Sequence, residues 1–287
     1  MKCYSKFLYP STMVEASRLL LLYNNAVPIA GGTDLSIQMD KKADRSHIFV
    51  DLMGLGWNYI SFSERFIRIG ATTTFTEILA SDLIQEKLPI LNIACGQIGS
   101  LQCRSMATIG GNLCSAVPSA DSATPLLVLD AVVELASVRG ARSVPLSEFF
   151  TGPRKTILER GEIMHEIQIP VPSTRSKSVF IKFGRRKAVT LSTVNVAVHS
   201  STNEQMRCIE HIRIALGAVA PTPVRAARAE KFLEGKQASS DAIDDAIAIA
   251  LTEISPISDI RASKEFRLDI SHILLKRALT KALEIST

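Results

Sequence analysis

The first half of the chain alternates between short apolar runs and one longer helical pattern. Thr12 and Glu15 form a capping-box pair ahead of an apolar stretch, which predicts a helix over residues 12–24. The run 27–30 ends at a glycine pair and precedes a helical pattern at 33–37, so we expect strand, glycine turn and helix. Further strands are predicted over 47–52, 66–70 and 163–170, and a helix over 74–80.

The pattern changes after the prolines at 170 and 172. These prolines and the basic segment 175–177 are typical of a linker. Beyond it, strands are predicted over 179–183, 193–199 and 209–216, and helices over 224–233, 242–254 and 270–283. Strands followed by helices indicate an α+β C-terminal domain.

Composition places the chain among globular proteins. Apolar residues make up 46% and charged residues 21%, near the averages of about 45–50% and about 25%. The longest apolar candidate, 124–136, is interrupted by Asp130 and Glu134, which favours buried core over a membrane span. The first residues lack the apolar region of a signal peptide, so we expect a cytoplasmic protein. The net charge of +5 is dispersed and aromatic residues are 6%, which disfavours nucleic-acid binding.

Several catalytic signatures are excluded by single positions. Tyr59 stands where a Rossmann turn needs its third glycine, and Gln237 where a phosphate loop needs serine or threonine. Ile169 replaces the second histidine of a zinc-protease signature. The five cysteines contain no C-x-x-C pair, which excludes the common zinc and iron–sulfur ligand patterns. If the chain belongs to an enzyme, its own side chains do not supply the redox or metal chemistry.

Two glycine turns are the most informative feature of the sequence. The first is I-A-G-G-T-D at residues 29–34, and the second is A-T-I-G-G-N at residues 107–112. Consecutive glycines permit positive φ and let several amide N–H groups converge on one anion, and a helix start after each turn would add its own N–H groups. The pair therefore fits a diphosphate. The alternative is that each glycine pair only makes a tight turn or a helix start.

At these turns the sequence resembles the FAD-binding subunits of the molybdenum hydroxylases. The resemblance lies in A-G-G-T-D at 30–34, in T-I-G-G-N-L at 108–113 and in S-A-D at 119–121, and it extends over essentially the whole chain. Within the family it is greatest to the FAD subunit of bacterial xanthine dehydrogenase. The segments that carry it are 119–125, 151–153, 220–223 and 261–268.

The resemblance implies an α+β fold with FAD held non-covalently in a two-part α/β domain of the PCMH type. Residues 1–57 and 58–175 would form its two subdomains, and 176–287 a smaller C-terminal domain with a short antiparallel sheet and helices. It implies no catalytic or metal-binding residue in this chain. The residues that it assigns to FAD are Pro28, Ile29, Ala30, Gly31, Gly32, Thr33, Asp34, Leu35, Thr108, Ile109, Gly110, Gly111, Asn112, Ser115, Ser119, Asp121, Ile163, Met164 and Lys182.

The implied roles differ among these residues. Main-chain amides of both turns would enclose the diphosphate, and the hydroxyls of the two serines would contact the cofactor. Asp121 would accept hydrogen bonds from it, Ile163 or Met164 would pack near the isoalloxazine ring, and Lys182 would hydrogen-bond to the ring. Alternatives are that Asp121 caps a helix starting near Ser122, that Met164 belongs to the core, and that Lys182 is solvated.

The resemblance also implies partners. A molybdopterin-binding large subunit and a [2Fe–2S] small subunit would form a heterotrimer or a dimer of heterotrimers with this chain, and FAD would pass electrons to NAD. The same subunit could instead serve a hydroxylase of carbon monoxide, an aldehyde or an N-heterocycle. A different class of function, outside the resemblance, is a non-catalytic protein that binds a phosphate-bearing ligand or a nucleic acid.

Overall fold

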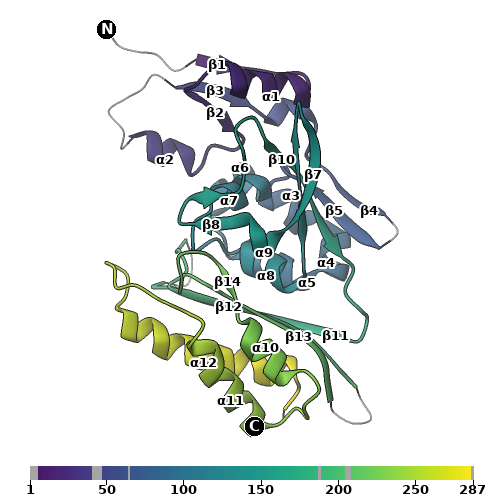
Figure 1. Cartoon of the computed structure of the whole chain (residues 1–287), viewed down its shortest axis with the longest axis vertical. Coiled ribbons are helices and arrows are strands. Elements are labelled where there is room, and N and C mark those ends of the chain that lie inside the picture. The colour runs from purple at the N-terminus through teal and green to yellow at the C-terminus, as the bar shows by residue number, and fades with distance from the viewer. Residues whose placement is uncertain (1–5, 41–46, 64, 187–188, 204–207, 286–287) are drawn as a thin grey trace.

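The computed structural model describes residues 6–40, 47–63, 65–186, 189–203 and 208–285. Three larger sheets follow one another along the chain and are stacked along the long axis of the molecule (Figure 1). The first glycine turn follows a strand of the N-terminal sheet, and the second lies between two helices of the central region. The C-terminal sheet lies beneath the central region (Figure 1). The predicted α+β class is confirmed.

The N-terminal sheet is parallel and has the strand order β1-β3-β2. Its strands are β1 (Lys6–Leu8), β2 (Ala26–Ile29) and β3 (Ile48–Asp51). Helix α1 (Met13–Leu22) joins the first two strands, and its first turn is capped by the Thr12 hydroxyl, which accepts a hydrogen bond from the Glu15 amide. The predicted capping residue is thus confirmed. Strand β2 delivers the first glycine turn, and α2 (Leu35–Asp40) follows it.

The central sheet is antiparallel, with strand order β4-β5-β10-β6-β7. Its strands are β4 (Ile60–Ser63), β5 (Phe66–Gly70), β6 (Val132–Ser137), β7 (Gly140–Pro145) and β10 (Ile163–Pro170). The helices between β5 and β6 are α3 (Phe75–Ala80), α4 (Asp82–Lys87), α5 (Pro89–Gly96), α6 (Leu101–Met106), α7 (Ile109–Cys114) and α8 (Ala123–Val128). Ile67, Ile69 and Ile167 contribute to the apolar core that the sheet shares with these helices.

Four short elements complete this half of the molecule. They are the 3-10 helix η1 (Met53–Leu55), helix α9 (Leu146–Phe149) and the small hairpin of β8 (Phe150–Gly152) and β9 (Lys155–Thr156). The turn of that hairpin brings Arg154 towards the second glycine turn, because its amide donates to the carbonyl oxygen of Ala116 at 2.8 Å.

The C-terminal sheet is antiparallel, with strand order β11-β12-β13-β14. Its strands are β11 (Ser176–Phe183), β12 (Val194–Asn203), β13 (Cys208–Gly217) and β14 (Val224–Arg225), and its helices are α10 (Ala227–Leu233), α11 (Ser240–Leu251) and α12 (Lys264–Ala282). One face of the sheet packs on these helices through Val196, Val198 and Ile214. The other face adds Phe180 and Ala197 to the core of the central region. Both faces are therefore covered, as Figure 1 also shows.

All three predicted helices of this domain have wrong boundaries. The helix predicted over 242–254 is α11, which begins at Ser240 and ends at Leu251. The segment 224–225 forms β14, and α10 begins only at Ala227. Helix α12 begins at Lys264, six residues before its predicted start at 270, because Ser263 caps it and a polar first turn hides the apolar period. In the described part of the chain, no helix is long and apolar enough to cross a membrane.

Candidate functional site

The two glycine turns lie against each other. A Cβ atom on Gly31 would overlap the carbonyl oxygen of Met106 and would lie 3.2 Å from the Cα atom of Ala107. Met106 and Ala107 lead directly into the second turn. The missing side chain of Gly31 therefore allows the main chains of the two turns to meet.

The first turn presents a row of free amides. Within the residues that the structure describes, the N–H groups of residues 31–35 donate to no protein acceptor. Gly32 has φ +67°, a left-handed backbone conformation that residues with a side chain rarely adopt. Successive unpaired amides around a residue of positive φ form a concave surface that binds anions. The first turn thus fits the diphosphate of the expected cofactor.

Among the described residues, the amides of the second turn are engaged except that of Thr108. The Ile109 and Gly110 amides donate to the carbonyl oxygens of Thr73 and Ala71, both at 3.0 Å. The Gly111 amide donates to the Thr108 hydroxyl at 3.1 Å. In the second turn, the Thr108 amide therefore remains available to an anion, and the amides of Ile109, Gly110 and Gly111 do not.

The first glycine of the second pair, Gly110, is required for packing. A Cβ atom on Gly110 would lie 2.6 Å from the Cβ atom of Ala71. The glycine thus lets α7 lie directly on the segment that follows β5. Since α2 and α7 have six residues each, the helix starts expected after the turns add little dipole.

Of the polar side chains at and after the second turn, Asn112 contacts Ser122 and Ser115 lies near Asp34. The Asn112 side-chain oxygen accepts a hydrogen bond from the Ser122 hydroxyl at 2.7 Å, which orients the Asn112 NH2 group as a donor away from that contact. The Ser115 hydroxyl is near enough to the Asp34 carboxylate to help lower its pKa. Ser119 is half-buried in the following loop. Ser115, the C-cap residue of α7, therefore lies beside the first turn.

Asp34 is the most heavily bonded side chain of the first turn. Its carboxylate accepts hydrogen bonds from Arg154 at 2.8 and 3.3 Å and from Gln38 at 2.7 Å. Burial raises its pKa, but hydrogen bonds from Arg154, Ser115 and Gln38 together with the arginine charge hold that pKa below its ordinary value. Arg154 was missed by the sequence reasoning, although it directly follows the T-G-P segment used for the resemblance.

The structure brings Asp121 and Lys182 together in a buried ion pair. The Lys182 ammonium lies 2.6 Å from the Asp121 carboxylate, and both side chains are buried. Asp121 also accepts hydrogen bonds from the Ser192 hydroxyl and, at 3.0 Å, from the Asn195 side chain. Burial raises the pKa of Asp121, and the Lys182 charge opposes that rise. The alternative that Asp121 caps α8 is wrong, because the amide-directed bonds of a cap are absent among its described contacts.

The alternative that Lys182 is solvated is also wrong, because its side chain is buried. Its ammonium donates to the carbonyl oxygens of Gln97 and Thr190, both at 2.9 Å, in addition to the Asp121 carboxylate. An ammonium has three protons, and all three are used within the chain. A hydrogen bond from Lys182 to a flavin would have to replace one of these contacts.

Ile163 and Met164 lie at the start of β10, each 3% exposed. Ile163 packs with Trp57 in the N-terminal cluster, and Met164 belongs to the central core. The backbone carbonyl oxygen of the next residue, His165, accepts a hydrogen bond from the Ala71 amide at 2.9 Å. This bond links β10 to the segment beneath the second turn. Both side chains are thus near the second turn in the fold but covered by protein.

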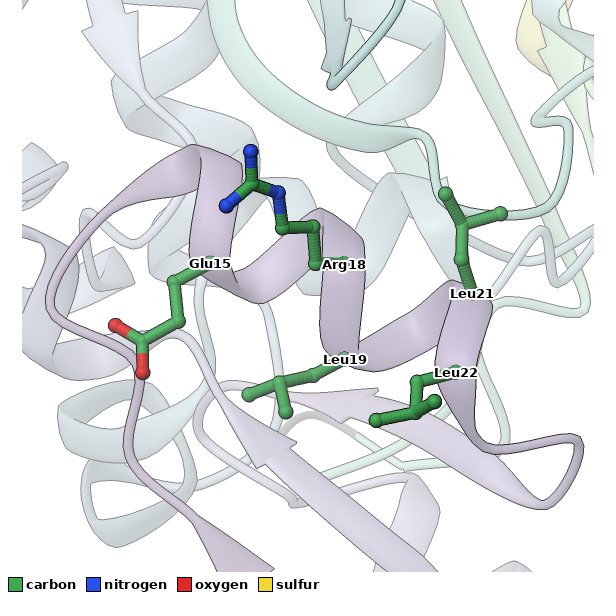
Figure 2. Close-up of a pocket in the computed structure, with 5 residues that line it drawn as sticks. All are labelled: Glu15, Arg18, Leu19, Leu21 and Leu22. Carbon is green, nitrogen blue, oxygen red and sulfur yellow. The ribbon is translucent and has the colours of Figure 1, made fainter.

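One surface hollow lies elsewhere. It has a volume of about 400 Å³ and is lined by residues of α1, namely Glu15, Arg18, Leu19, Leu21 and Leu22 (Figure 2). None of the residues expected to contact the cofactor lines it. The hollow is therefore not a candidate for the flavin site.

The family of the chain follows from comparison with known proteins. A family model described as "FAD binding domain in molybdopterin dehydrogenase" matches residues 3–172. The chain belongs to this FAD-binding family. A second model, "CO dehydrogenase flavoprotein C-terminal domain", matches residues 179–282. The family resemblance and the expected cofactor, FAD, are thereby confirmed.

Similar proteins cover nearly the whole chain. The putative xanthine dehydrogenase FAD-binding subunit of Escherichia coli (strain K12) is 36% identical over 275 residues, which is 95% of this chain and 94% of that protein. The glyceraldehyde dehydrogenase medium chain of Sulfolobus acidocaldarius is 33% identical over 93% of this chain and 94% of its own length. Among solved structures, carbon monoxide dehydrogenase from Hydrogenophaga pseudoflava superimposes with a TM-score of 0.94 at 29% identity and 98% coverage of both chains.

Proposed function

We propose that this chain is the electron-transfer subunit of a molybdenum hydroxylase that acts as a xanthine dehydrogenase. The supporting observation is the row of unpaired amides at residues 31–35, packed against the second turn of the family motif. The 36% identity to a xanthine dehydrogenase FAD-binding subunit supports the substrate. FAD, when bound, accepts single electrons and delivers a hydride.

In this proposal each part of the site has its own task. The amides of residues 31–35 hold the diphosphate, and Thr33 and the Asn112 NH2 group add donors beside it. Pro28, Ile29, Ala30 and Leu35 frame the first turn, as Thr108, Ile109 and the second glycine pair frame the other wall. Ser119 and Ser115 line the path beyond the second turn, and Ile163 and Met164 support it from beneath. Asp121 and Lys182 close the site on the side of the C-terminal domain.

The remaining components lie on other chains. A large subunit would carry molybdopterin, a small subunit would carry two [2Fe–2S] clusters, and the assembly would be a cytoplasmic heterotrimer or dimer of heterotrimers. NAD would be the final electron acceptor. The cysteines of this chain support that division, because no group of three or more potential metal ligands occurs among the described residues.

The test is purification of the tagged full-length chain from its native cell. We expect a flavin absorbance spectrum and stoichiometric molybdenum and iron in the purified complex, with xanthine-dependent reduction of NAD. A folded chain that lacks flavin would overturn the assignment of the site. Flavin without molybdenum and iron would overturn the proposed partners.

A second candidate substrate class is an aldehyde. The 33% identity to a glyceraldehyde dehydrogenase medium chain favours it. The same purified complex separates the two candidates, since an aldehyde dehydrogenase would reduce its acceptor with glyceraldehyde and not with xanthine.

A further inference from the structure

The first turn contains an acid where the proposed function puts a doubly charged anion. The Asp34 amide belongs to the row of unpaired donors at 31–35, so its carboxylate is attached to the same residue that would contact the diphosphate. That carboxylate is about one-third exposed and stays ionised, since its pKa is lowered. Two anions this close repel each other unless a cation compensates one of them.

Arg154 is in position to compensate that charge. It contacts Asp34 through two nitrogen atoms, at 2.8 and 3.3 Å, which is the forked geometry that arginine makes with a carboxylate. Among the described residues, it is the one cationic side chain with a hydrogen bond or ion pair to either glycine turn. The two residues are 120 positions apart in sequence. The contact is thus made by the fold and not by local structure.

The backbone at Arg154 carries strain that a glycine would avoid. Arg154 has φ +58°, and Ala116, whose carbonyl oxygen accepts the Arg154 amide proton, has φ +44°. Left-handed conformations at residues other than glycine are uncommon and cost energy. The Arg154–Ala116 backbone contact holds the arginine in this conformation. Its visible partner is Asp34.

We propose that Arg154 is a positioning residue for the cofactor diphosphate: by neutralising Asp34 and fixing it in place, it makes the first turn able to accept an anion. This inference rests on the proposed binding of FAD at that turn. Asp34 then connects Arg154 to Gln38 through hydrogen bonds, and its compensated charge no longer repels the ligand. The role predicts that removing Arg154 harms binding only while Asp34 keeps its charge.

The test is a set of variants of the full-length chain, stripped of flavin and titrated with FAD and with riboflavin, which lacks phosphate. Arg154→Met leaves Asp34 uncompensated, Asp34→Asn removes the acid, and the double variant removes both charges. Arg142→Met is the matched control, since Arg142 makes a comparable two-nitrogen ion pair with Glu162, both at 2.8 Å, on the central sheet. Isothermal titration and flavin fluorescence give each Kd.

We expect Arg154→Met to raise the Kd for FAD about tenfold or more, with little change for riboflavin, and the double variant to lie within about threefold of the wild type. Arg142→Met should leave both values unchanged. The inference is overturned if Arg154→Met binds FAD as the wild type does, if the double variant is as weak as the single one, or if riboflavin weakens equally. A wild-type chain that binds no FAD would instead overturn the proposed function, and this inference with it.

Discussion

Gly31 determines whether the first turn can approach the second. A Cβ atom there would overlap the Met106 carbonyl oxygen, which belongs to main chain and cannot rotate away. We expect Gly31→Ala to separate the turns, to lower the free energy of unfolding by roughly 1–3 kcal/mol and to abolish retention of FAD. Gly54→Ala is the control, because no atom lies within 4 Å of its added Cβ. FAD content per chain and urea unfolding measure both effects; full FAD content in Gly31→Ala would contradict the prediction.

The sequence predicted the individual turns but not how their atoms are used. Glycine pairs stand out in a sequence because glycine adopts backbone conformations that other residues disfavour, and both pairs were identified as candidate ligand contacts. Whether an amide is free depends on what packs against it, and the partners of the second turn come from Ala71 and Thr73. Arg154 was missed for the same reason, since no local pattern links it to Asp34.

At the scale of single elements, α12 shows how one buried charge connects several segments. The Arg267 guanidinium is buried and donates to the carbonyl oxygens of Thr193 and Ala218 at 2.5 and 3.0 Å. It also contacts the Asp259 carboxylate at 2.8 Å. These contacts fix the loop that carries Ser192, a partner of Asp121. The first turn of α12 therefore connects several segments of the domain through Arg267. Because this turn is polar, the apolar periodicity of the sequence did not predict that the helix begins there.

We expect Arg267→Met to lower the free energy of unfolding by about 3 kcal/mol, because it leaves the carbonyl groups of Thr193 and Ala218 without this donor and removes one of the donors of Asp259. Arg277→Met, on an exposed position of the same helix, should change it by less than about 0.5 kcal/mol. Urea unfolding followed by circular dichroism measures both. Equal stability of the two variants would refute the role given to Arg267.

Strand β12 contributes a pH dependence. His199 is buried beside His211 and Arg213, and its ring contacts the Ser178 hydroxyl at 2.7 Å. Burial first, and then these neighbouring charges, lower its pKa from 6.5 to about 4, although Asp130 opposes the shift. The folded state thus resists protonation that the unfolded state accepts, and stability present above pH 6.5 is lost as the pH falls towards 4.

We expect this loss to be on the order of 2 kcal/mol and to be reduced in His199→Gln. Unfolding free energies measured from pH 7.5 to pH 4 for both chains provide the check, with His272→Gln, on an exposed position of α12, as the control. The same steep slope in His199→Gln would exclude this histidine as the cause.

At the scale of the whole molecule, two carboxylates of the central region hold the C-terminal domain. Asp121 pairs with Lys182, and Asp130 pairs with Arg213 and Arg225 at 3.3 and 2.8 Å. The order of strands and helices was predictable from the change in periodicity after the prolines. This docking was not, because each pair joins residues far apart in the sequence.

We expect Lys182→Met to lower the free energy of unfolding by about 3–5 kcal/mol, since it leaves Asp121 as an unpaired buried charge. Combining it with Asp121→Asn should restore part of that loss. Lys276→Met, which breaks an exposed pair with Asp244, should cost less than about 1 kcal/mol. A double variant no more stable than Lys182→Met would contradict this account.

Because the C-terminal sheet is covered on both faces, we expect the molecule to unfold as a single cooperative unit despite its three sheets. If the C-terminal domain melted first, the apolar side chains around Phe180 and Ala197 would meet water on both sides of the boundary. Calorimetry of the full chain should therefore show one endotherm with equal van't Hoff and calorimetric enthalpies. A chain cut at the connection 171–175 should in turn aggregate, so neither half can be exchanged between relatives as an independent module.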